Sequence, residues 1–392
     1  MTTAKESNQI IGVTTRAIEK EYGHVIKWLG EAAEEKREYL STGCLGLDNA
    51  VGRGGFERGL ILEIFGNEGV GKSFLGYSVM LEACKIGHKC AIVDAENSLD
   101  PSLLLRIGLP EKSVIVVDGA PTGEANLSIA QSLMETGEFA AVMIDSVAAL
   151  VPEARMEADF DQQSMGLHAR LLSAGIQKIL PVVKRTNTLL IFINQIRNKI
   201  GSYGNPETTT GGKALPFYAA YRVQVHGGQS KSSKLVDAAG GVYGHRTVFK
   251  VVKNKRAAPW RQAEVDLIYG LGYDTDGELL DLGVDMGLIE KGGAWLTYGE
   301  YKWQGREKAK LALQKDIPMR DALEKQIRLI ITGEVIDTPV EAESEIQTGD
   351  VEAEVTSRFE IQEAAKKEKL KEAQNDKPSR KKRAGKSTES SS

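Results

Sequence analysis

The chain has 392 residues, with 50 lysines and arginines against 54 aspartates and glutamates, so its formal net charge is −4. This near balance excludes a protein that binds nucleic acid through overall positive charge, although it permits local basic patches. The three cysteines form no CxxC pair and the five histidines are scattered, which argues against a disulfide scaffold, a zinc site and a metalloenzyme with protein-only ligands. The sequence contains neither an uncharged apolar run of about 18 residues nor a signal-peptide core, so we expect a cytoplasmic protein with no membrane partner.

The first two-thirds of the chain predict an N-terminal helix followed by alternating strands and helices. Residues 14–29 favour an amphipathic helix because apolar side chains recur at helical spacing. They are Ile18, Tyr22, Val25 and Leu29. The runs predicted as strands are Leu60–Phe65, Cys90–Val93, Val114–Val117, Ala140–Ile144, Thr188–Asn194, Tyr221–Val225 and Thr247–Val252. Longer helical stretches separate most of them, so we expect βαβ units and a mainly parallel sheet with helices on its faces.

The last third of the chain changes character twice. Residues 270–332 contain short glycine-punctuated segments and a predicted helix through Ala322–Ile330, which indicates a small second α/β domain. Residues 334–360 are acid-rich and residues 361–386 are rich in lysine and arginine, a composition that cannot bury enough apolar surface to fold alone. We therefore predict four parts: 1–38, an N-terminal helix and linker; 39–269, the core; 270–332, the C-terminal domain; and 333–392, a disordered tail.

A phosphate-binding loop is the most informative motif. The residues Gly66, Asn67, Glu68, Gly69, Val70, Gly71, Lys72 and Ser73 match GxxxxGK[ST] between a predicted strand and a predicted helix. Glycines let backbone N–H groups turn toward phosphate oxygens, and the start of the helix adds a positive field. Lys72 would neutralise the β- and γ-phosphates, and the Ser73 hydroxyl would bind Mg²⁺. The alternative is a glycine-rich turn that holds no ligand.

Three polar residues at strand ends are candidates for the chemistry beside this loop. Asp145 follows an apolar strand and can hold Mg²⁺, unless it only caps the next segment. Glu96 can orient or deprotonate an attacking water, unless it belongs to a solvated acidic turn. Gln195 can sense the γ-phosphate and pass its presence to the following loop, unless it is an ordinary polar strand end.

Two polar loops and one basic strand end are the other candidates. Residues 196–212 carry glycines, hydroxyls and bases suited to sequence-independent phosphate contacts, and residues 157–165 form a second polar segment. Either stretch could equally be a mobile surface loop. Lys253 and Lys255 are predicted on one side of a strand end, where they either bind an anion, such as a neighbouring subunit's phosphate, or form a solvated edge.

With these motifs assembled, the sequence resembles the bacterial RecA recombinase family from about residue 14 to 332. The stretches that carry the resemblance are Leu40–Gly43, Gly66–Ser73, Val93–Asn97, Ile144–Leu150, Leu189–Arg197, Gly204–Gly212 and Val251–Pro259. The resemblance implies an α/β phosphate-loop NTPase core with a mainly parallel central sheet, an N-terminal helix and a small C-terminal α/β domain. It also implies a DNA-dependent ATPase that forms filaments on single-stranded DNA, searches duplex DNA for homology and exchanges strands in recombination, repair and the SOS response to DNA damage.

The resemblance assigns roles to individual residues as well. ATP with Mg²⁺ would lie between subunits of a helical homo-oligomer, with Glu96, Lys72, Gln195 and the neighbour-directed Lys253 and Lys255 as catalytic groups. Asp100 would join the phosphate loop in ATP binding, and Ser73 and Asp145 would hold the metal. The positions that match DNA contacts are Met165, Arg170, Ser173, Arg197, Lys199, Gly211 and Gly212. Further expected partners are duplex DNA, captured through the C-terminal domain, and single-strand-binding and mediator proteins in the cytoplasm of a bacterium or of a phage host.

The sequence departs from the family pattern at several positions. Leu103 stands where an aromatic often packs on adenine, Gln177 replaces a basic residue, Pro216 replaces a common lysine, and His226-Gly227 replaces an arginine pair of the weaker second DNA site. These changes bear on that second site more than on the ATPase. Two other functions stay open at this stage. A hexameric helicase of the same fold class predicts closed rings and strand unwinding, and a structural DNA-coating protein predicts DNA binding without a nucleotide response.

Overall fold

The computed structural model describes residues 4–23, 25–34, 36–157, 166–198, 207–228 and 230–333. The chain divides into a unit Met1–Val335 and a unit Ile336–Ser392, and the second lies wholly outside the described residues. Met165, Lys199 and the predicted disordered tail beyond Gly333 lie outside the described residues. No helix in the described ranges is long and apolar enough to span a bilayer.

The N-terminal segment forms two helices, α1 (Ala4–Tyr22) and α2 (Leu29–Glu34). The prediction of one helix over 14–29 is therefore wrong. Gly23 adopts a left-handed φ of +79°, and its N–H closes the helix on the Glu19 carbonyl at 2.9 Å. Glycine enters this region at little cost and commonly ends helices. Val25 and Leu29 consequently do not extend the apolar face of α1.

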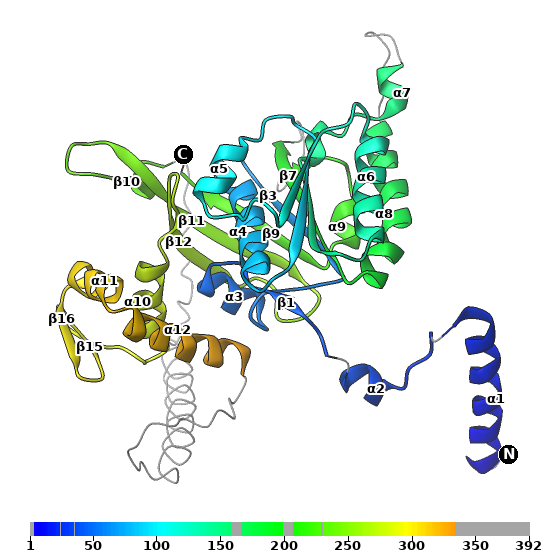
Figure 1. The fold of residues 1–392 in the computed structure, drawn as a ribbon, viewed down its shortest axis with the longest axis horizontal. Helices are drawn as coiled ribbons and strands as arrows, with labels where there is room; N and C mark the ends of the chain where they lie inside the picture. Colours follow the sequence, from blue (N-terminus) through cyan, green and yellow to red (C-terminus); the bar gives the residue numbers. More distant parts are fainter. Residues whose placement is uncertain are drawn as a thin grey trace, which may run out of the picture. The chain divides into compact units, whose positions relative to one another are not determined.

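The core is built on one large, mostly parallel sheet with the order β13-β12-β11-β9-β3-β7-β6-β4-β5 (Figure 1). Its strands are β3 (Ile61–Gly66), β4 (Lys89–Asp94), β5 (Val114–Asp118), β6 (Phe139–Asp145), β7 (Leu189–Asn198), β9 (Tyr221–Gly227), β11 (Val242–Asn254), β12 (Gln262–Ile268) and β13 (Gly272–Tyr273). The six strands from β9 to β5 pair in parallel, and β11, β12 and β13 continue antiparallel. The α/β class and the seven predicted strands are confirmed.

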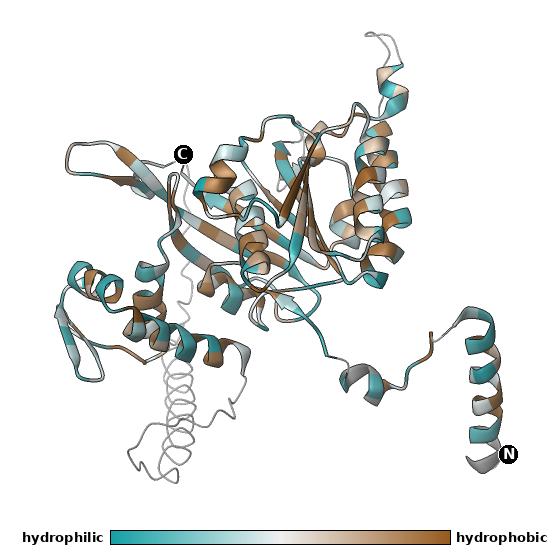
Figure 2. Ribbon diagram, in the orientation of Figure 1, coloured by the Kyte–Doolittle hydropathy of each residue, from teal (hydrophilic) through white to brown (hydrophobic). Residues whose placement is uncertain are grey.

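Helices cover both faces of this sheet (Figure 1). On one face lies α4 (Lys72–Lys85), and on the other lie α6 (Gly123–Glu135), α8 (Leu167–Arg185) and α9 (Ala214–Tyr218). The central strands are hydrophobic along most of their length because both faces are covered (Figure 2). The shorter elements are α3 (Leu45–Val51), α5 (Pro101–Arg106), α7 (Glu153–Met156), β1 (Tyr39–Leu40), β2 (Phe56–Glu57), β8 (Glu207–Thr209) and β10 (Lys234–Val236).

The predicted small C-terminal α/β domain is also confirmed. It contains α10 (Thr275–Asp285), an antiparallel sheet of β14 (Glu290–Gly292), β15 (Trp295–Tyr298) and β16 (Tyr301–Gln304), then α11 (Arg306–Lys315) and α12 (Ile317–Thr332). Leu279, Leu313, Leu323 and Ile327 anchor its separate hydrophobic core.

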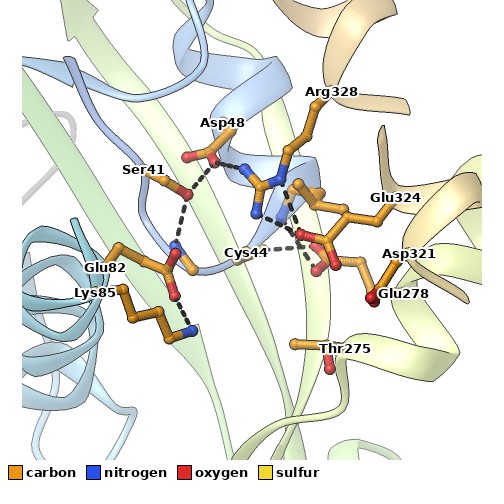
Figure 3. A network of polar contacts seen from close by, with 12 residues as sticks. Ser41, Cys44, Asp48, Glu82, Lys85, Thr275, Glu278, Asp321, Glu324 and Arg328 are labelled. Atoms are coloured by element: carbon orange, nitrogen blue, oxygen red, sulfur yellow. Dashed lines mark hydrogen bonds and ion pairs between the residues drawn. The ribbon is translucent and has the colours of Figure 1, made fainter. Parts of the chain in front are cut away.

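Buried acids join this domain to helix α3 of the core (Figure 3). Glu278 on α10 accepts hydrogen bonds from the Cys44 thiol at 2.8 Å and from the backbone N–H groups of Leu45 and Gly46. Asp48 on α3 accepts from the Ser41 hydroxyl and the Thr42 N–H, and the Arg328 guanidinium of α12 lies 3.8 Å away. Burial raises the pKa of Asp48 to about 7 and also raises the pKa of Glu278.

Candidate nucleotide site and nucleic-acid face

Glycines shape the turn from β3 into α4. Gly69 and Gly71 adopt left-handed φ values of +72° and +92°, which strain any other residue. A Cβ atom on Gly66 would meet the Val225 carbonyl oxygen at 2.3 Å. The loop therefore needs glycine at these three positions, and its backbone is free to wrap around an anion at the start of α4.

Lys72 folds back over the loop that precedes it. Its Nζ atom donates to the Asn67 carbonyl at 2.6 Å, and the residue is buried. Burial lowers the pKa of Lys72, against the attraction of the carboxylates of Asp145 and Glu96. A cation held at the centre of the loop is suited to a polyphosphate, which would replace the carbonyl as its partner.

Ser73 and Asp145 meet beside the loop. The Ser73 hydroxyl acts on Asp145 to lower the pKa of its carboxylate, but burial outweighs this effect and raises that pKa to about 6. A hydroxyl and a carboxylate are oxygen ligands of the kind that Mg²⁺ prefers. In the described ranges, no three His, Cys, Asp or Glu residues gather as a metal cluster. These two oxygens therefore fit a Mg²⁺ ion that arrives with nucleotide phosphates and keeps several waters.

Glu96, Gln195 and Ser146 converge on the same edge of the sheet. The Gln195 side-chain amide donates to Glu96 Oε1 at 3.4 Å, and the Ser146 hydroxyl donates to the same oxygen. Glu96 is exposed, so water reaches its carboxylate. Sequence reasoning missed Ser146 as a member of this group. Its signal in the sequence was its place directly after the strand-end Asp145.

Asp100, the remaining predicted ATP contact, caps a short helix. Its carboxylate accepts hydrogen bonds from the N–H and the hydroxyl of Ser102 at the start of α5, both at 2.9 Å. These hydrogen bonds lower the pKa of Asp100. The side chain is exposed and engaged locally, so its predicted contact with a nucleotide stays a prediction.

Lys253 is anchored away from the phosphate loop of its own chain. Its Nζ atom donates to the carbonyls of Pro216 and Phe217, at 2.7 and 2.8 Å, in the last turn of α9. Burial lowers the pKa of Lys253, and the neighbouring charges of Lys255 and Arg222 lower it further. Lys255 is exposed just beyond the end of β11. The alternative that both lysines form a solvated strand edge therefore holds for Lys255 but not for Lys253.

Most predicted DNA contacts that the structure describes gather around one end of α8. Arg170 and Ser173 lie on α8, and Gly211 and Gly212 pack against it so closely that a Cβ on Gly211 would meet the Leu172 side chain at 2.0 Å. Arg197 is exposed near the end of β7. Gln177, the departure from the family pattern, bonds the Tyr218 hydroxyl at 3.0 Å. The structure therefore brings Gly211 and Gly212 against the helix that carries Arg170 and Ser173.

Comparisons with known proteins agree along nearly the whole described chain. The family described as RecA N-terminal domain matches residues 9–274, and the family described as RecA C-terminal domain matches residues 277–332. A protein named "Protein RecA" from Chlorobium chlorochromatii is 42% identical over 337 residues, which cover 84% of this chain and 94% of the relative. Proteins of the same name from Helicobacter hepaticus and Azospirillum lipoferum are 41% and 44% identical, covering 87% and 79% of this chain and 99% and 86% of the relatives.

Proposed function

The chain belongs to the bacterial RecA recombinase family, and we propose that the convergence of Glu96, Gln195 and the phosphate loop is its ATP switch. It is a DNA-dependent ATPase that serves homologous recombination and DNA repair through ATP-dependent strand exchange. The contact between Gln195 and Glu96 carries the proposal, because it links the catalytic carboxylate to a strand that leads toward the DNA face.

The phosphate loop and the residues beside it bind different parts of the nucleotide. Backbone N–H groups from Gly66 to Ser73, together with Lys72, bind the phosphates, Ser73 and Asp145 hold Mg²⁺, and Asp100 contacts the nucleoside. When bound, ATP supplies the γ-phosphoryl group that is transferred to water. Glu96 orients that water and accepts its proton, since the carboxylate is exposed to solvent and aligned by Ser146 and Gln195.

The DNA face responds through Gln195. Beyond β7, the chain returns as β8 and reaches Gly211 and Gly212, with the Thr210 N–H bonded to the Gln195 carbonyl at 3.3 Å. A shift of Gln195 toward a γ-phosphate therefore moves backbone that supports Arg197, Gly211 and Gly212. With Met165, Arg170, Ser173 and Lys199, these residues form the proposed contact with DNA phosphates.

Lys253 and Lys255 complete the nucleotide site of a neighbouring subunit in a helical homo-oligomer. This proposal rests on the anchoring of Lys253 to α9, which ties it to no group of its own phosphate loop in the described contacts. Segment 1–38 serves oligomerisation, 39–269 is the ATPase core, and 270–332 meets duplex DNA. Single-strand-binding and mediator proteins and a cytoplasmic location complete the proposal.

One experiment tests this function directly. ATP hydrolysis is measured with and without single-stranded DNA, and the complexes are imaged by electron microscopy. We expect hydrolysis that depends on DNA, together with continuous helical filaments formed with a non-hydrolysable ATP analogue. Closed rings that unwind duplex ends would instead indicate a helicase, and DNA binding that ignores nucleotide would indicate a structural coat.

A further inference from the structure

A fully buried carboxylate lies in the middle of the central sheet and has no part in the site described above. Glu63 is on β3, in register with Phe192 of β7 on one side and Arg222 of β9 on the other. Its side chain is 0% exposed. A buried carboxylate requires charged or hydrogen-bonding partners, because the protein interior does not replace the lost hydration.

Both oxygens of Glu63 are engaged, and each by a different neighbouring strand. Oε1 accepts from the Asn194 side-chain amide at 2.9 Å, and Oε2 accepts from Arg222 Nε. The Arg222 guanidinium also lies over the Phe65 ring, 4.5 Å from its centroid. Glu63 thus bridges β7 and β9 across the strand that leads into the phosphate loop.

Asn194 extends this contact toward the nucleotide and DNA sides. Its amide nitrogen also donates to the Thr210 carbonyl at 3.0 Å, and its oxygen accepts from the Gln195 N–H at 2.8 Å. Gln195 touches Glu96, and Thr210 immediately precedes Gly211. One buried side chain therefore holds the proposed γ-phosphate sensor and the proposed DNA segment together.

Arg222 extends the contact in the opposite direction, toward the proposed subunit boundary. Lys253, which pairs with Arg222 between β11 and β9, is repelled by Arg222 and attracted by Glu63. Lys253 in turn holds the carbonyls at the end of α9, the helix that follows Gly212. The charge of Glu63 therefore acts at both ends of the segment from Thr210 to Tyr218.

We propose that Glu63 is a positioning residue that couples three sites within one subunit: its own nucleotide site, the DNA segment at Thr210–Gly212, and the lysine given to the next subunit. The inference rests on the proposed function. A movement of Gln195 or Thr210 that rotates the Asn194 amide would break its bond to a carboxylate that is 0% exposed. Such a group favours two discrete arrangements over gradual change.

The test compares Glu63→Gln, which removes the charge and keeps the shape, with the parent and with two further variants. Glu63→Gln alone leaves the charge of Arg222 without its carboxylate partner, which can prevent folding. The double variant Glu63→Gln/Arg222→Gln removes both charges and avoids this problem. Thr188→Val is the matched control, since Thr188 is also fully buried beside β7 but bonds the Phe139 carbonyl at the opposite end of the strand. Thermal unfolding and nucleotide binding are measured for all proteins.

Two readouts report coupling. One is the ratio of hydrolysis with and without single-stranded DNA, and the other is the ratio of DNA affinities with and without a non-hydrolysable ATP analogue. We expect Glu63→Gln and the double variant to bind nucleotide as the parent does, and to lower both ratios by about twofold to thirtyfold. Thr188→Val should leave both ratios unchanged, even where it lowers the unfolding temperature.

The outcomes separate the two levels of the argument. Unchanged ratios in folded Glu63→Gln or in the double variant, beside a parent that responds to DNA, would overturn the coupling role alone. Ratios that fall equally in Thr188→Val would overturn it too, since they would then report stability. A parent whose hydrolysis ignores DNA would refute the proposed function, and the inference with it.

Discussion

Lys253 and Lys255 sit two residues apart and carry the same charge, yet the structure predicts different consequences for their loss. The Lys253 ammonium donates to two carbonyls at the end of α9, at 2.7 and 2.8 Å, whereas Lys255 is exposed. A hydrogen bond contributes about 0.5–1.5 kcal/mol net, so Lys253→Ala should cost about 1–3 kcal/mol of folding free energy. One of the two bonds is exposed to water, which favours the lower half of that range. Lys255→Ala should change stability by less than about 0.5 kcal/mol.

Both variants should nevertheless lose most DNA-stimulated hydrolysis, because each removes a cation from the composite site proposed at the subunit boundary. Urea unfolding measures the first effect, and hydrolysis on single-stranded DNA measures the second. The Lys253/Lys255 double variant is then mixed with Glu96→Gln. At a mixed interface, intact lysines from one subunit can meet an intact Glu96 in the other.

Hydrolysis above the sum of the separate variants is expected from a composite site. Absence of rescue, with co-assembly shown by labelled subunits, would mean that the lysines act within their own subunit or on DNA. Equal urea midpoints for Lys253→Ala and Lys255→Ala would show that the anchoring of α9 adds nothing to stability. Each of these two results refutes a separate step of the reasoning.

Three further predictions follow from single contacts. Lys72→Ala should lower hydrolysis at least a hundredfold while the protein stays folded, because the only side-chain cation in the phosphate loop is lost; hydrolysis within twofold of the parent would contradict this role. Glu96→Gln should still bind ATP and form DNA complexes that dissociate more slowly, as measured by competitor challenge; failure to bind nucleotide would make Glu96 structural. Burial raises the pKa of Asp48 from 3.8 to about 7. Protonated Asp48 therefore makes its full contribution to the free energy of unfolding below pH 4, and this contribution is lost as the pH rises through 7. The free energy of unfolding of Asp48→Asn, measured in urea, should therefore rise relative to that of the parent by up to roughly 4 kcal/mol between pH 4 and 8. A difference that does not change with pH would show that burial does not perturb the titration of Asp48.

Some of the fold was predictable because the central strands are apolar on both faces. A strand such as Ala140–Ile144 stands out as a continuous run between polar ends, and the observed strand Phe139–Asp145 extends it by one residue on each side. β12 gave no such run, since polar and buried residues alternate along Gln262–Ile268. The helix predicted over 14–29 failed at Gly23, where periodicity continued through a residue that ends the helix.

The candidate site was predictable only where its residues are contiguous or end a strand. The loop from Gly66 to Ser73 carries its chemistry in eight consecutive residues. The bond between Lys253 and Pro216 spans 37 positions, and the bond between Glu63 and Asn194 spans 131. In each bond, the sequence around one residue does not indicate its partner, because the order of strands in the sheet brings the two together. In the sequence, Glu63 is a charged residue within an otherwise apolar strand, and only its contacts with Asn194 and Arg222 show why it is tolerated there.

The anchoring of Lys253 to α9, described above, has a consequence for the ends of an assembly. If Lys253 and Lys255 serve the neighbouring subunit, as proposed, every contact is head-to-tail, so the assembly is polar and its two ends differ. The subunit at one end would then receive no lysines, and the lysines of the subunit at the other end would meet no nucleotide. Such a filament would hold one fewer complete site than it has subunits, and short filaments would hydrolyse less ATP per subunit than long ones. Nucleotide in the incomplete terminal site would outlast the rest, which gives that end a different lifetime on DNA.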